Sequence, residues 1–142
     1  MNIKLDKLTS KTFTVAGKDY EVRDIPYKQA RHLVDTIRMA FGRLNSNTML
    51  TTDASGGLDA GATALQVIGL LTSEEIDFIE DKLFPFVMVR IEGADIMQPL
   101  SAVKDRVFGS DVISAYEVIV RSLCASFLDS LIARGFLSAP RG

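Results

Sequence analysis

The chain has 142 residues, of which 47% are hydrophobic and 24% charged, and this predicts a single folded domain over 1–142. A formal net charge of −2 and the lack of any Lys/Arg run give no reason to expect a nucleic-acid partner. The opening residues lack the apolar core of a signal peptide, and no apolar run approaches the ~20 residues of a membrane span, so a cytoplasmic protein is expected.

Residues 12–24 are predicted to form a β-hairpin that turns at Gly17-Lys18, because glycine provides the positive φ of a tight turn. Bulky residues alternate with polar or small ones on both sides of the turn, which places them on one face. These residues are Phe13, Val15, Tyr20 and Val22. An isolated hairpin is marginally stable in water, so this one is expected to pack on helices or on a third strand.

A helix is predicted over about 26–44, with Pro26 in its first turn. Its apolar residues recur at helical spacing and form one stripe. They are Ala30, Leu33, Val34, Ile37, Phe41 and Leu44. Residues 45–63 then lose this periodicity and are rich in Asn, Ser, Thr and Gly, so we expect a mobile connection.

The next segments carry clearer local signals. Residues 62–71 are expected to form a short helix. Thr72-Ser73-Glu74-Glu75 is a capping box that opens another helix, which Pro85 ends near Phe84. Residues 86–91 are bulky and β-branched, and they predict a strand that could join the hairpin.

Residues 94–109 are expected to be an irregular connection containing Pro99, with one helical turn ending at Phe108-Gly109. The last helix is predicted to be capped by Ser110, with Asp111 near its positive end and Gly135 after its last turn. Its apolar stripe is broad enough to be buried on two sides, either at the centre of the domain or in a subunit interface.

These elements predict an α+β fold that is mainly α. An N-terminal β-hairpin, with a third strand as an option, packs on a small helical bundle with a long C-terminal helix.

No catalytic, cofactor-binding or metal site is predicted. The chain has one histidine, His32, and one cysteine, Cys124, which support neither a zinc set nor a nucleophile–histidine pair. His32 is expected to be a boundary residue on the first helix, and Cys124 a buried core residue. A single cysteine allows no disulfide framework, which fits a reducing compartment. Five carboxylates are predicted to form a solvated helix face. They are Glu74, Glu75, Asp77, Glu80 and Asp81.

Three stretches carry a resemblance in their order and spacing. Residues 13–30 combine a hairpin with a helix start, residues 71–79 contain the capped helix, and residues 105–111 lead into the long helix through Phe127. This arrangement resembles the tail assembly chaperones of long-tailed bacteriophages. The similarity covers most of the chain outside residues 45–63.

The resemblance implies a protein of the host cytoplasm that coats the tape-measure protein and keeps it soluble during tail assembly. It further implies recruitment of tail-tube subunits, absence from the finished virion, oligomerisation, and in many members a longer, frameshifted form. The wide stripe of the last helix could then bury against a helical client or a second copy. Candidate partner-binding residues are Met49, Leu50, Leu58, Tyr116 and Phe127. For the first three, stray apolar positions in a linker are the favoured interpretation.

Three other classes stay open. The first is a structural tail or neck component, which would remain in the virion. The second is a small DNA-binding regulator, against which the near-neutral charge argues. The third is an enzyme with a site around His32 or the carboxylates of the helix that starts at Thr72.

Overall fold

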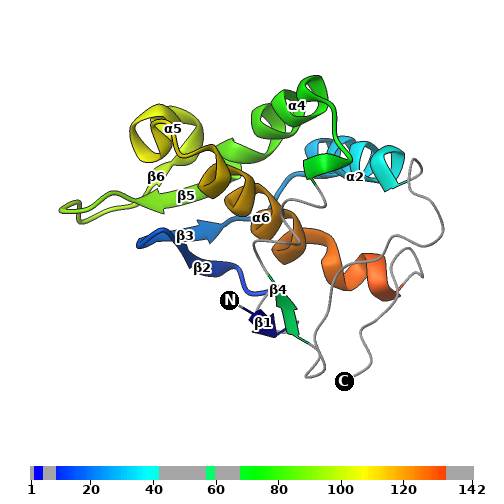
Figure 1. The fold of residues 1–142 in the computed structure, drawn as a ribbon, viewed down its shortest axis with the longest axis horizontal. Coiled ribbons are helices and arrows are strands. Elements are labelled where there is room, and N and C mark those ends of the chain that lie inside the picture. The colour runs from blue at the N-terminus through cyan, green and yellow to red at the C-terminus, as the bar shows by residue number, and fades with distance from the viewer. Residues whose placement is uncertain (1, 5–8, 42–56, 60–67, 134–142) are drawn as a thin grey trace.

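The computed structural model describes residues 2–4, 9–41, 57–59 and 68–133 (Figure 1). It has the expected α+β architecture, in which helices pack on an antiparallel sheet. The strands are β1 (Asn2–Lys4), β2 (Thr12–Val15), β3 (Lys18–Val22), β4 (Gly57–Asp59), β5 (Val87–Arg90) and β6 (Gln98–Pro99). The helices are α2 (Tyr27–Phe41), α4 (Ser73–Leu83), the 3-10 helix η1 (Phe84–Phe86), α5 (Leu100–Phe108) and α6 (Val112–Ala133).

The larger sheet has four antiparallel strands in the order β2-β3-β5-β6. The predicted third strand is therefore confirmed as β5, and β6 was not predicted. Phe13, Tyr20 and Val89 lie in register across three strands, and all three are buried. The rings of Phe13 and Tyr20 stack with their centroids 5.5 Å apart, so the alternating residues of the hairpin form one layer of the core.

The hairpin turn lies one residue earlier than predicted. Val15 pairs with Lys18, so the two-residue loop is Ala16-Gly17, with φ of 50° and 78°. Positive φ at both loop residues is the geometry of a type I′ turn, which matches the twist of the flanking strands. Lys18 belongs to β3 instead of the turn.

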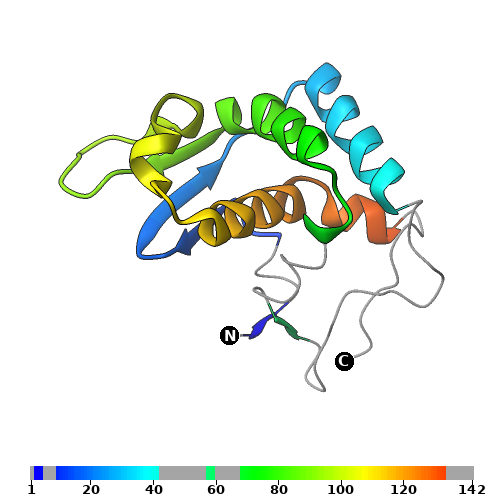
Figure 2. The same cartoon turned by 45° about the horizontal axis from the view of Figure 1, so that its top comes forward.

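Helix α6 runs through the middle of the domain (Figures 1 and 2). It contacts β2 and β3 on one side and α4 and α5 on the other. The expected two-sided burial is thus achieved within one copy of the chain. Over residues 112–127, the part of α6 whose burial is described, the buried residues are Val118, Ile119, Val120, Ser122, Leu123 and Ala125.

The helix starts show one prediction confirmed and two corrected. At Thr72 both capping-box bonds form, because the Glu75 N–H donates to the threonine hydroxyl (3.1 Å) and the Thr72 N–H to the Glu75 carboxylate (2.9 Å). The cap of α6 is Asp111 instead of Ser110, since its carboxylate accepts from the N–H of Ser114 (3.1 Å). The helical turn predicted to end at Phe108-Gly109 is the last turn of a longer helix, α5, so the irregular connection predicted over 94–109 was wrong from Leu100 onward.

The expected mobile connection over 45–63 lies outside the described residues, apart from Gly57–Asp59. Those three residues form β4, which pairs antiparallel with β1 in a separate two-stranded sheet. The predicted cap at Gly135, most of the helix predicted over 62–71 and the end of the first helix also lie outside the described residues.

The turn at Ala16 provides a test of the hairpin. A side chain at positive φ costs about 1–2 kcal/mol, and asparagine tolerates this region better than alanine. We expect Ala16→Asn to raise the free energy of unfolding by about 0.5–1 kcal/mol, measured by urea denaturation. Ala16→Val is the matched control and should lower it, because a β-branched residue is disfavoured at positive φ. Equal stabilities of the three proteins would contradict the type I′ turn.

Candidate functional site

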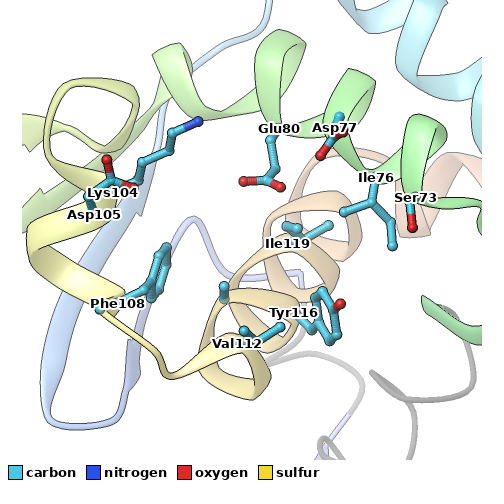
Figure 3. A pocket seen from close by; sticks show the side chains of 12 residues that line it. Ser73, Ile76, Asp77, Glu80, Lys104, Asp105, Phe108, Val112, Tyr116 and Ile119 are labelled. Carbon is cyan, nitrogen blue, oxygen red and sulfur yellow. The ribbon is translucent and has the colours of Figure 1, made fainter.

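A groove of about 350 Å³ lies between α4, α5 and the first half of α6 (Figure 3). Helix α4 provides one wall, α5 and the turn after it provide the other, and α6 forms the floor. The lining residues are Ser73, Ile76, Asp77, Glu80, Lys104, Asp105, Phe108, Gly109, Val112, Ala115, Tyr116 and Ile119.

The floor of the groove is apolar and opens to solvent at the start of α6. Ile119 is buried in the core, and Ile76, Phe108 and Tyr116 are half-buried and packed against it. Val112 is 50% exposed at the first residue of α6. Apolar surface is therefore continuous from the core to the mouth of the groove, which is suited to contact with apolar side chains of a ligand.

The angle between α5 and α6 depends on Gly109. Its φ of 55° and ψ of −118° lie in a region that is open essentially only to glycine. The Gly109 N–H donates to the Asp105 carbonyl (3.0 Å), and the Asp111 N–H donates to the Phe108 carbonyl (2.8 Å). This compact turn leaves Phe108 and Val112 on the same groove (Figure 3).

Glu80 is a charged residue that extends over the apolar floor of the groove (Figure 3). Its half-buried side chain extends from α4 toward α6, near Ile119 (Figure 3). Burial raises the pKa of its carboxyl group above the usual value, Lys104 on α5 opposes the shift, and Asp77 adds to it. The solvated-face prediction was therefore wrong for Glu80 and also for Glu75, which is half-buried in the capping box, whereas Glu74, Asp77 and Asp81 are exposed as expected.

The predicted partner-binding residues do not gather at one place. Tyr116 lines the groove, and Phe127 is half-buried against the hydrophobic core. Leu58 lies in β4, where its backbone pairs with Ile3 of β1. Met49 and Leu50 lie outside the described residues.

His32 and Cys124 lie on different helices, α2 and α6. The His32 ring is 6.0 Å from the ring of Phe78, between α2 and α4. Burial raises the pKa of the Cys124 thiol to about 12, so it stays protonated at neutral pH. Among the described residues, no three His, Cys, Asp or Glu side chains converge as ligands for a metal ion.

Tyr116 is the one groove residue that was predicted to bind a partner, and Glu80 and Val112 are two of those that were not. Glu80 follows Ile76 by four positions, and this spacing places it on the inner side of α4. The position of Glu80 could therefore be predicted from the sequence. The exposure of Val112 could not, because it depends on the turn at Gly109 and on how α5 packs.

No protein-family model, curated protein sequence or solved structure matches the chain. Within the described ranges, none of the helices is both long enough and apolar enough to span a bilayer.

Replacing Gly109 tests the turn that shapes the groove. We expect Gly109→Ala to lower the free energy of unfolding by about 1–3 kcal/mol, because alanine is strained at this φ and ψ. Gly69→Ala is the matched control, since Gly69 is helical, has no atom within 4 Å of an added Cβ and is not at positive φ. It should be neutral or stabilising. Thermal and urea unfolding would measure both, and equal effects of the two substitutions would contradict the assigned turn.

Glu80→Gln tests whether the groove carboxylate is held in an unfavourable environment. A carboxyl pKa that is raised on folding makes the free energy of unfolding fall as pH rises through that pKa. We expect the variant to be more stable than the wild type at pH 7, by less than about 1 kcal/mol because the group is partly solvated. The difference should vanish below pH about 4, where the carboxyl group is protonated in both states. Glu74→Gln, on the exposed first turn of α4, should instead be neutral or slightly destabilising.

Proposed function

We propose that this chain is a tail assembly chaperone of a long-tailed bacteriophage, which binds the tape-measure protein and keeps it soluble until the tail tube assembles. The groove between α4, α5 and α6 is the observation that carries the proposal. It presents an apolar floor, an open mouth and a half-exposed Val112. The order of hairpin, capped helix and closing helix supports it through the family resemblance.

The geometry favours a helical client over an extended one. Helical ligands insert apolar side chains at i, i+3 and i+4 into grooves between helices, whereas extended ligands add to the free edge of a sheet. The free side of β2 is partly covered, because the Thr14 carbonyl accepts a hydrogen bond from Arg121 of α6 (3.2 Å). Strand β6 at the other edge is only two residues long and contains Pro99.

The wide stripe of α6 has a different role from the one expected. Val118, Ile119 and Leu123 are buried in the domain's own core, so these residues do not face a client. In the proposal the client contacts the first turns of α6, at Val112 and Tyr116. Phe127, which packs on the core, supports the fold instead.

The remaining parts of the proposed role rest on the resemblance to tail assembly chaperones. The chain acts without catalysis in the host cytoplasm, helps recruit tail-tube subunits, self-associates and is absent from the mature virion. A longer, frameshifted form would carry the same groove, and both forms would bind the tape-measure protein.

Co-expression with the tape-measure protein, taken as the long helical protein encoded nearby, tests the proposal. The wild-type chain should bring this client into the soluble fraction and co-purify with it. Val112→Gln should lower recovery of the complex roughly tenfold, because it leaves an unpaired amide in an apolar contact. Met39→Gln is the matched control on α2, outside the groove and similarly exposed (56% against 50%), and should behave like the wild type.

Two results would contradict the proposal. One is an insoluble client in the presence of the wild-type chain. The other is detection of this protein in purified virions by mass spectrometry, which would favour a structural tail or neck component.

A further inference from the structure

The Glu80 carboxylate lies at an apolar site without a direct partner. Within the described part of the chain, it forms no hydrogen bond and no ion pair. The charge of Lys104 on α5 acts on the Glu80 carboxyl group and lowers its pKa, but the two side chains, both drawn in Figure 3, do not form an ion pair. A partly desolvated carboxylate that lacks a donor destabilises the free protein, and a cation delivered by a ligand would offset that cost.

The other charges of the groove favour a cationic ligand. Three carboxylates line it, those of Asp77 and Glu80 on α4 and of Asp105 on α5, against the single ammonium group of Lys104. The residues that α6 contributes to the lining carry no charge at neutral pH. The local field is therefore negative above an apolar floor, which attracts an apolar segment that carries positive charge.

The shape of the groove fits a helix better than a small molecule. Sites for small molecules enclose most of the ligand surface. Here the rim residues Ser73, Asp77 and Asp105 are exposed, and Val112 is half-exposed at the mouth. An open groove of about 350 Å³ accommodates side chains from one face of a helix while the rest of that helix stays outside.

We infer that the groove recognises an amphipathic helix carrying a Lys or Arg beside its apolar stripe, with the cation paired to Glu80. This inference rests on the proposed client-binding role of the groove and adds the chemistry of the client. The apolar stripe contacts Ile76, Phe108 and Val112, and the cation lies between α4 and α5. Glu80 is then a specificity residue, which selects among apolar helices by charge.

Binding of designed peptides tests this chemistry directly. The probes are two fluorescein-labelled amphipathic helices of about 20 residues, long enough to be helical alone. They have the same leucine stripe and differ only in one flanking position, Lys or norleucine. Fluorescence anisotropy should show tighter binding of the Lys peptide to the wild-type chain. Glu80→Gln should weaken the Lys peptide about tenfold, since a hydrogen bond to a charged group contributes about 1.5–3 kcal/mol.

Three controls make the experiment decisive. The norleucine peptide should bind Glu80→Gln at least as tightly as the wild type, because a neutral amide loses less than a carboxylate when a ligand without a cation excludes water, and this closes a double-mutant cycle on the cation and the carboxylate. Glu74→Gln removes the same charge outside the groove and should leave the Lys peptide unaffected. Thermal unfolding separates lost binding from lost folding, because the melting temperature of Glu80→Gln should be at least as high as that of the wild type.

The inference and the proposed function fail in different ways. Equal affinity of the Lys peptide for the wild type and Glu80→Gln overturns the inference, as does preference for norleucine or no binding of the Lys peptide. The co-expression result with Val112→Gln does not depend on that charge, so the proposed function stands or falls separately.

Discussion

The burial of α6 between the sheet and the α4–α5 pair is the constraint on which the rest of the structure depends. One interaction orients the helix on the sheet: the Arg121 guanidinium lies 4.8 Å from the ring centre of Phe13 and donates to the Thr14 carbonyl. It combines a cation–π contact with a hydrogen bond to the outer strand. Because burial lowers the pKa of Arg121, the charge bears a desolvation cost that these contacts offset.

The same interaction limits how the protein associates with others. An uncovered outer strand is a template for pairing with another chain. In β2, the Thr14 carbonyl is occupied by Arg121, and the Thr12 N–H and carbonyl bond to the hydroxyl of Ser10. These contacts leave less of the β2 edge open to pairing with another strand, and the proposed client site lies instead in the groove formed by α4, α5 and α6.

Local chemistry accounts for the parts of the fold that could be predicted. The hairpin alternation and the Thr72 capping box depend on neighbours within a few residues, so the sequence alone reveals them. The exact turn could not be read, because nothing in the sequence marks Ala16 for positive φ. Only the last turn of α5 was predicted, because Pro99 suggested an irregular connection before it, and the longer helix is stabilised by burying Leu100 and Val107.

The groove was harder to predict than the fold, because its parts come from three helices. Tyr116 was identified as a binding residue from the apolar spacing of α6, but the same spacing also selected Phe127, which packs on the core. Periodicity indicates which residues avoid water, and it does not distinguish the domain's own core from a partner-binding surface. That distinction depends on the angle between α5 and α6, which is set by Gly109.

In the proposed role, the position of Glu80 gives this groove a selectivity that apolar packing alone would lack. An apolar helix could bind to many exposed hydrophobic surfaces in a cell, so burial provides affinity with little discrimination. A carboxylate beside the floor penalises every ligand that fails to bring a cation, because the group then loses water without gaining a donor. In the proposed role, the instability that Glu80 causes in the free chaperone is therefore the source of its selectivity. Replacing it with a leucine-like residue would strengthen the fold and remove the distinction between the client and other apolar helices.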